Sequence, residues 1–207
     1  MLPSVLADRR DRRVGILGGS FNPAHRGHLH VSREALKRLD LDEIWWMVAP
    51  QNPLKPTRGM ASFAARMRGA REMAHEPRIK VTDIEARLGT RFTADTLDAL
   101  RKRFPRTRFV WLMGADNLSQ IRHWERWQDI FCRVPVAVFD RPTYCLKASA
   151  GLAAARFKKY RVLHCDRRRL ADSAPPAWTL FRIRLDASSA TALRARRERV
   201  AQSIIER

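Results

Sequence analysis

Short apolar runs alternate along this chain with segments that have the period of a helix, and this alternation constrains the fold more than any other feature. We expect strands at residues 14–17, 44–48, 79–83, 108–113, 134–139 and 178–185, with one further short run at 162–164. We expect helices at residues 27–39, 63–74, 93–104 and 151–160. Such alternation predicts an α/β fold: a Rossmann-like, open, mainly parallel sheet with helices on both faces.

The length and composition indicate one domain with an ordinary hydrophobic core. The chain has 207 residues, of which 45% are hydrophobic and 30% are charged, and this suffices for a domain without disulfide or metal support. Residues 14–207 are expected to form that domain, with a helical part at its C-terminal end, and residues 1–13 a flexible extension. Residues 1–13 lack the apolar core of a signal peptide, and the longest uncharged apolar runs, 44–49 and 134–139, are strand-sized. We therefore expect no membrane association.

The cysteines point to a reducing compartment. Cys132, Cys145 and Cys165 form no Cys-x-x-Cys pair, and three is an odd number. This argues against both a disulfide framework and a structural zinc site. A cytoplasmic protein fits this pattern best.

The net charge of +20, with a sequence pI near 11.4, should attract polyanions. The basic residues are spread along the chain, with local concentrations at residues 101–108, 167–169 and 194–199, and they form no single basic arm. This spread favours solvated helix faces over a dedicated nucleic-acid groove. A basic nucleic-acid-binding protein on a nucleotide-binding fold stays as a second hypothesis.

A glycine-rich turn follows the first expected strand and precedes the first expected helix. Residues 18–28 read Gly-Gly-Ser-Phe-Asn-Pro-Ala-His-Arg-Gly-His. Gly18 and Gly19 would let backbone N–H groups and a helix N-terminus approach a phosphate. His25 and His28 are three residues apart, so in a first helical turn their imidazoles share a face. The segment therefore predicts an anion site with two imidazole donors.

Other sites that use glycine turns or paired histidines fit this segment less well. It lacks both the G-x-x-x-x-G-K-[ST] pattern of a P-loop and the G-x-G-x-x-G fingerprint of dinucleotide binding. Zinc is disfavoured because His25 and His28 have no third ligand nearby and no H-E-x-x-H pattern. Histidines that only cap a helix remain an alternative.

A second candidate anion site lies near the C-terminus, where residues 186–194 read Asp-Ala-Ser-Ser-Ala-Thr-Ala-Leu-Arg. If this segment opens a helix, its hydroxyls and first-turn N–H groups would bind an anion, and Arg194 would add a planar fork for phosphate oxygens. Taken alone, it is more typical of an ordinary helix N-cap before a basic terminal helix.

Taken whole, the glycine-rich segment resembles the signature of the HxGH nucleotidyltransferase superfamily, and residues 188–194 resemble its Ser-(Ser/Ala)-Thr-x-x-Arg signature. The resemblance implies adenylyl transfer from ATP by a nucleotidyltransferase domain. It implies catalytic roles for His25, His28 and Arg194. The ATP-binding residues that it implies are Gly18, Gly19, Ser20, Phe21, His25, His28, Ser189, Thr191 and Arg194.

Between the two signatures, the order of landmarks resembles bacterial nicotinate-nucleotide adenylyltransferases over residues 14–199. The segments that carry this are Ala-Pro-Gln-Asn-Pro-Leu-Lys-Pro at 49–56, Arg-Phe-Thr-Ala-Asp-Thr-Leu at 91–97, and Met-Gly-Ala-Asp-Asn-Leu at 113–118 with the His-Trp that follows at 123–124. The resemblance implies that nicotinate mononucleotide is bound by Lys55, Thr93, Asp116 and Trp124. In that family the turn at Thr93 holds the nicotinate carboxylate through backbone amides, Trp124 stacks on the pyridine ring, and Asp116 reaches the mononucleotide.

The chain also departs from that family pattern. Lys55 stands where a histidine is frequent, Phe92 replaces a tyrosine, and Glu125 replaces an aromatic residue. From the residues alone, Trp124 is also typical of a core position, because Trp127 follows at helical spacing, and Thr93 is also typical of a helix N-cap.

The implied reaction joins ATP and nicotinate mononucleotide into nicotinate adenine dinucleotide with release of pyrophosphate, a step of NAD biosynthesis. We expect in-line attack without a covalent intermediate, Mg²⁺ bound through the ATP phosphates, and no metal site on the protein. The alternatives are another HxGH adenylyltransferase, with nicotinamide mononucleotide or phosphopantetheine as acceptor, and the nucleic-acid-binding protein named above. A homo-oligomer is left open.

Overall fold

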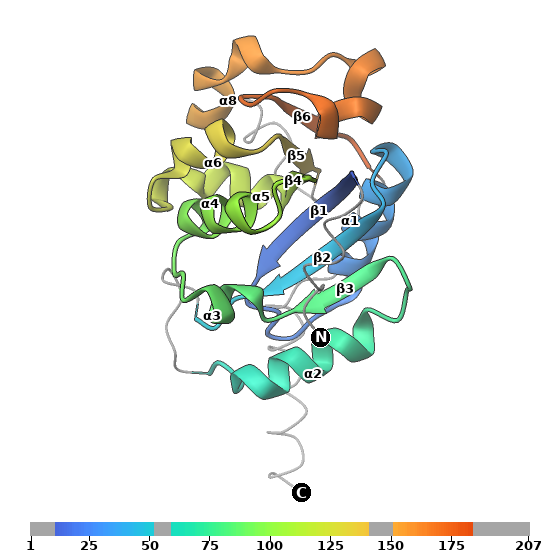
Figure 1. The fold of residues 1–207 in the computed structure, drawn as a ribbon, viewed down its shortest axis with the longest axis vertical. Helices are drawn as coiled ribbons and strands as arrows, with labels where there is room; N and C mark the ends of the chain where they lie inside the picture. The colour runs from blue at the N-terminus through green and yellow to red at the C-terminus, as the bar shows by residue number, and fades with distance from the viewer. Residues whose placement is uncertain (1–10, 52–58, 141–150, 184–207) are drawn as a thin grey trace, which may run out of the picture.

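The computed structural model describes residues 11–51, 59–140 and 151–183, which form a sheet covered by helices (Figure 1). The sheet has six parallel strands in the order β3-β2-β1-β4-β5-β6. They are β1 (Arg12–Gly19), β2 (Glu43–Val48), β3 (Ile79–Thr82), β4 (Thr107–Gly114), β5 (Val136–Phe139) and β6 (Trp178–Phe181). The expected Rossmann-like α/β fold is confirmed, and the first strand begins at Arg12, two residues before its predicted start.

The order of the strands reverses at β1. From β1 the chain adds β2 and β3 on one side, then returns to pair β4 with the other side of β1 and continues outward through β5 and β6. The register places Val14 beside both Glu43 of β2 and Phe109 of β4. In open parallel sheets, ligands bind beyond the carboxyl ends of the strands at such a reversal. The fold therefore predicts a site at the ends of β1 and β4.

Helices cover both faces of the sheet, and Figure 1 shows α1 and α4 on opposite sides. One face packs against α1 (Arg26–Arg38), α2 (Phe63–Met73) and a 3-10 helix at His164–Asp172. The other face packs against α3 (Ile84–Leu88), α4 (Thr93–Arg103), α5 (Ala115–Gln120), α6 (Trp127–Arg133) and α8 (Leu152–Arg156). Shorter 3-10 turns lie at Ile121–His123 and Lys158–Tyr160.

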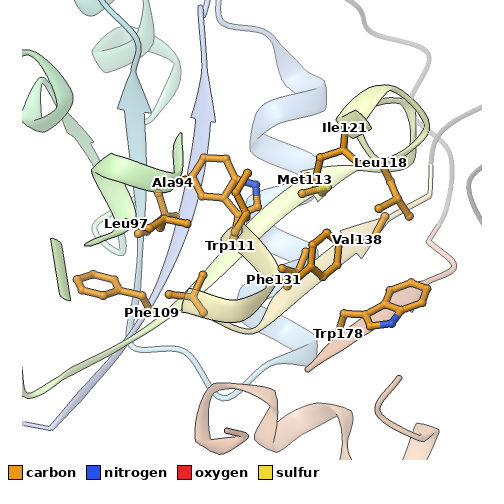
Figure 2. Packing of buried hydrophobic residues seen from close by; sticks show 14 of the residues in the cluster. Ala94, Leu97, Phe109, Trp111, Met113, Leu118, Ile121, Phe131, Val138 and Trp178 are labelled. Atoms are coloured by element: carbon orange, nitrogen blue, oxygen red, sulfur yellow. The ribbon is translucent and has the colours of Figure 1, made fainter. Parts of the chain in front are cut away.

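The strands are almost entirely apolar because both faces of the sheet are covered. Successive residues enter opposite layers: the ring of Trp45 lies 5.4 Å from that of Phe104, whereas Trp46 donates from Nε1 to Ser32 Oγ of α1 at 2.7 Å. Figure 2 shows part of the cluster on the α4 side, where Trp111 of β4 lies beside Ala94 and Leu97 of α4. On the opposite face, the helix expected at 27–39 buries its apolar residues Leu29, Ala35 and Leu39.

The structure corrects the expectations at the end of the described chain. The helix expected at 151–160 is interrupted at Phe157, whose backbone leaves the helical region and whose carbonyl accepts the indole N–H of Trp178 at 2.8 Å. The strand expected at 162–164 is wrong: pairing stops after an isolated bridge from Arg161 to Trp178, and a 3-10 helix begins at His164. The run at 134–139 begins as a strand only at Val136.

Two further expectations concern the last strand and the segment that follows it. The last strand ends at Phe181, and residues 184–185 of its predicted span lie outside the described residues. The segment 186–194 lies outside them too. Within the described residues, none of the helices combines the length and the apolar character needed to span a bilayer.

Candidate active site

The glycine-rich turn lies at the carboxyl end of β1, between β2 and β4. Gly18 and Gly19 are the last residues of β1, and the carbonyl of Gly19 accepts the N–H of Ala49, just past the end of β2, at 2.9 Å. The chain then turns through residues 20–25 into α1. The predicted strand, turn and helix are therefore present at the point where the strand order reverses.

His25 and His28 lie together at the start of α1. His25 is the N-cap residue, and its Nδ1 accepts the backbone N–H of Gly27 at 3.1 Å. The Nδ1 of His28 accepts the N–H of His25 at 3.2 Å, and the two ring centroids are 3.9 Å apart. Because each Nδ1 accepts a hydrogen bond, a neutral ring carries its proton on Nε2. Capping therefore makes both imidazoles N–H donors, which suits them to phosphate oxygens, so the capping alternative and the anion-binding hypothesis are compatible.

Phe21 and Trp46 fix the position of the His28 ring. The centroid of Phe21 is 4.6 Å from that of His28, and Phe21 stacks on Trp46 at 5.2 Å. Ser32 accepts the indole N–H of Trp46 at 2.7 Å and donates to the carbonyl of His28 at 2.9 Å. The ring and the backbone of His28 are thus both connected to β2. These contacts limit the rotation of an imidazole whose orientation determines where its N–H group points.

The turn between β1 and α1 has an unusual backbone that is held from a distant segment. Phe21 has a φ of 47°, in the left-handed region that side chains rarely adopt. The side chain of Asn22 accepts the N–H of Ala61 at 3.1 Å and donates to the carbonyl of Gly59 at 3.3 Å. Ser20 is buried, and its Oγ has no hydrogen-bond partner among the described residues. Of the residues expected to bind ATP, Gly18 and Gly19 therefore end β1, and Ser20 and Phe21 begin a turn that includes one buried hydroxyl.

Trp111 of β4 connects this turn to Trp124. A Cβ at Gly18 would lie 2.4 Å from Cη2 of Trp111, so packing as well as any approach by a phosphate requires glycine there. The same indole meets Trp124 edge to face, with 6.4 Å between the rings. From the sequence, Trp111 was assigned only to a strand. The pattern of apolar residues in a strand does not show which side chain extends toward the carboxyl end of that strand.

Two of the expected acceptor residues, Thr93 and Asp116, lie at helix starts beyond the same edge of the sheet. Thr93 is the first residue of α4 and follows the N-cap residue Phe92, which provides no side-chain cap, so the alternative in which Thr93 is the N-cap is wrong. Asp116 lies in the first turn of α5, directly after β4. Trp124 is half-buried after a 3-10 turn, whereas Trp127 begins α6, so the spacing of the two tryptophans does not reflect one helix face.

A buried acid supports the start of α4. Glu85 of α3 is 5% exposed, and its Oε1 accepts the hydroxyl of Thr96 at 3.3 Å. The Oγ1 atom of Thr96 also lies 2.7 Å from Oγ1 of Thr90 and 3.1 Å from the carbonyl oxygen of Phe92, so its single proton is shared between that carbonyl and the Glu85 carboxylate. Burial raises the pKa of Glu85 to about 7, although the bond from Thr96 acts to lower it. These bonds connect α3 and the loop at Thr90 to the turn that presents Thr93.

Four expected site residues lie outside the described residues: Lys55, Ser189, Thr191 and Arg194. Their roles, like those of the other site residues, remain predictions. One residue that sequence reasoning missed is Arg66 of α2, which is buried against the turn. Its spacing from the buried Met67 and Ala70 places it on the apolar face of the helix, and this was the available signal.

Comparison with known proteins gives concordant matches. The model of the cytidylyltransferase-like family matches residues 16–196. A protein of Parvibaculum lavamentivorans named "probable nicotinate-nucleotide adenylyltransferase" is 54% identical over 89% of this chain and 92% of its own length. A protein of Cereibacter sphaeroides with the same name is 54% identical over 88% of this chain and 96% of its own length.

Solved structures agree in fold. A Plasmodium falciparum nicotinic acid mononucleotide adenylyltransferase, complexed with NaAD, aligns with a TM-score of 0.67 at 18% identity and covers 89% of this chain and 83% of that one. The same enzyme complexed with APC aligns with a TM-score of 0.65 at 17% identity. At these identities the likeness concerns the fold.

Proposed function

This chain belongs to the cytidylyltransferase-like family, and we propose that it transfers the adenylyl group of ATP to nicotinate mononucleotide, a step of NAD biosynthesis. The products are nicotinate adenine dinucleotide and pyrophosphate. The observation that carries the proposal is the pair of histidine rings, 3.9 Å apart, at the strand reversal. It occurs in a chain that is 54% identical, over nine-tenths of its length, to a protein named for this activity.

The proposed chemistry is one in-line displacement. A 5′-phosphate oxygen of nicotinate mononucleotide forms a bond to the α-phosphorus of ATP, while the bond from that phosphorus to the bridging oxygen breaks and its electron pair leaves with pyrophosphate. Holding the two anions in line can supply about 7–11 kcal/mol of the barrier reduction. The Nε2–H groups of His25 and His28 would bind the phosphate oxygens on which negative charge increases, each worth about 3–4 kcal/mol by analogy with an oxyanion-hole donor.

The remaining roles follow the superfamily's signatures. Ser189, Thr191 and Arg194 would hold the triphosphate from the side opposite the histidines, and Arg194 would act in catalysis. Gly18 and Gly19, with Ser20 and Phe21, would bring the backbone close to ATP. The buried Oγ of Ser20, which lacks a partner among the described residues, supports this assignment.

The acceptor would bind beyond the ends of α4 and β4. The first-turn N–H groups of α4 at Thr93 lack a side-chain cap from Phe92, which supports their use for a carboxylate. Trp124 would stack on the pyridine ring, with its plane set by the edge contact to Trp111. Asp116 would reach the mononucleotide. Lys55 would contribute a phosphate contact.

A divalent metal ion, which we propose to be Mg²⁺, would come with the ATP. In the described part of the chain no group of three or more His, Cys, Asp or Glu side chains is arranged to hold a metal ion. The ion would keep several waters and bind the phosphates of ATP. When bound, the ion would neutralise charge on the triphosphate. The excess of basic residues, +20 in net charge, would attract both anionic substrates.

The test measures pyrophosphate release from ATP and Mg²⁺ with three acceptors in parallel: nicotinate mononucleotide, nicotinamide mononucleotide and phosphopantetheine. We expect rapid release with the first only. Equal rates with nicotinamide mononucleotide would refute the carboxylate-reading role of the turn at Thr93. Release with none of them, together with salt-sensitive binding of RNA or DNA, would favour the nucleic-acid-binding alternative.

A further inference from the structure

The side chain of Arg66 is a buried cation for which the proposed function has no role so far. It lies on the covered face of α2 with Met67 and Ala70 and is 3% exposed. Burial lowers the pKa of its guanidinium below its ordinary value. None of the described carboxylates forms an ion pair with it. A buried charge without a counter-ion is costly unless hydrogen bonds offset its lost hydration.

Four backbone carbonyls from three separate segments provide those hydrogen bonds. Nη1 donates to the carbonyls of Ser20 and Ala49, both at 2.7 Å, and Nη2 donates to that of Pro50 at 2.5 Å. Nε donates to the carbonyl of Ala61 at 3.1 Å. One guanidinium therefore joins the turn after β1, the segment after β2 and the residues that precede α2. The planar fork of arginine can make these bonds together, whereas an ammonium group cannot reach the same geometry.

The carbonyl of Ser20 is the important contact because it precedes the strained residue of the turn. Phe21, with its φ of 47°, is in a strained conformation that persists only where its surroundings enforce it. Arg66 holds the peptide on the N-terminal side of Phe21, and Asn22 is held on the other side by Gly59 and Ala61. The segment 59–66 thus holds the backbone on both sides of Phe21.

Any movement of the turn would reach the histidines. The ring of Phe21 lies 4.6 Å from that of His28, which in turn lies 3.9 Å from that of His25. The N–H of His25 is bound by Nδ1 of His28. If the turn relaxed toward an ordinary backbone, Phe21 would leave its contact with the ring of His28, and His28, whose ring lies beside that of His25, would lose the support that fixes its position.

We propose that Arg66 is a positioning residue of the candidate active site, which acts through the carbonyls of Ser20, Ala49 and Pro50 to hold the turn on which the orientation of His25 and His28 depends. The inference deepens the proposed function and rests on it for its kinetic consequence. Its structural consequence, the orientation of two imidazoles, is measurable without turnover.

The test compares three variants of the full chain. Arg66→Lys keeps the positive charge and loses the fork, and Arg66→Met removes the charge as well. Arg68→Met is the matched control, because Arg68 lies on the same helix and is exposed. For each variant we would record the imidazole nitrogen and proton signals of His25 and His28 by NMR, the affinity for a non-hydrolysable ATP analogue, and kcat and KM per folded molecule.

In Arg66→Lys we expect displaced imidazole signals of His25 and His28 and a loss of about tenfold in kcat/KM, and in Arg66→Met a loss of the order of a hundredfold, as for misplaced groups in other active sites. Arg68→Met should match the unmodified protein in every measurement. Should Arg66→Met fail to fold, Arg66→Lys alone decides. Unchanged imidazole signals and kinetics within twofold in folded Arg66→Lys would overturn the proposal. Displaced signals in a protein that transfers no adenylyl group with any acceptor would support the positioning role while refuting the proposed function.

Discussion

Replacing Glu85 by glutamine should make the protein more stable in neutral and alkaline solution. Glu85 is buried, and the carboxylate accepts a hydrogen bond from Thr96 at 3.3 Å, which the amide oxygen of a glutamine can also accept. The two side chains have nearly the same size. Glu85→Gln therefore removes the ionisation of this residue while it keeps the packing and the bond from Thr96.

The stability depends on pH because the folded protein and the unfolded chain bind the proton of Glu85 with different affinities. The pKa of Glu85 is about 7 in the folded protein against an ordinary value of 4.5, so between these values the folded state binds more protons than the unfolded chain. The free energy of unfolding consequently falls as the pH rises from about 4.5 to about 7. Above about pH 7, the protonation of Glu85 no longer contributes to stability. The difference between these two pKa values of Glu85 corresponds to about 3 kcal/mol in the free energy of unfolding. Glu85→Gln has no such titration and should exceed the unmodified protein by up to this amount at pH 8.

Urea unfolding followed by tryptophan fluorescence at pH 5, 6, 7 and 8 measures this directly. The difference in free energy of unfolding between Glu85→Gln and the unmodified protein should be small at pH 5 and grow to a plateau above pH 7. Glu72→Gln is the control, since Glu72 is exposed on α2, and it should show no such growth. A difference for Glu85→Gln that stays constant from pH 5 to pH 8 would refute the reasoning about its burial.

Four further substitutions test the site and its packing. His28→Ala should lower kcat by a hundredfold to a thousandfold with the circular dichroism spectrum retained, because a phosphate donor is lost; near-normal turnover would contradict this. Gly18→Ala should cost about 1–3 kcal/mol in urea unfolding, because its Cβ would lie 2.4 Å from Cη2 of Trp111. Trp111→Phe, which lacks that atom, should recover part of the loss in the double variant, and strictly additive effects would exclude the contact. Trp124→Leu should raise KM for nicotinate mononucleotide much more than KM for ATP, whereas equal changes in both would argue against ring stacking.

The sheet and its principal helices were predictable because their signals are long and local. Runs of five or six mostly apolar residues are typical of buried strands. The apolar residues of α1 recur with the helical period over more than three turns. The short helices α3, α5 and α6, of five to seven residues, were missed because fewer than two turns give too little periodicity to recognise.

The candidate site was predictable only as far as its motif extends. The spacing of His25 and His28 indicated a shared helix face, and their rings are together in the structure. The left-handed backbone of Phe21 and the carbonyl contacts of Arg66 arise from tertiary packing, in which Arg66 meets Ser20, 46 residues away, as well as Ala49 and Pro50, and no local pattern encodes such contacts. The buried state of Glu85 has the same origin, since an acid in a five-residue helix gives no sign of its partners.

His25 and His28, at the start of α1, and Arg194, near the C-terminus, should bind one triphosphate. A crystal structure of the chain with a non-hydrolysable ATP analogue and Mg²⁺ tests this expectation most directly. We predict phosphate oxygens within hydrogen-bond distance of Nε2 of both His25 and His28, with the guanidinium of Arg194 bound to the same triphosphate. A nucleotide bound elsewhere, or an Arg194 that lies on a different surface from the histidines, would contradict the account.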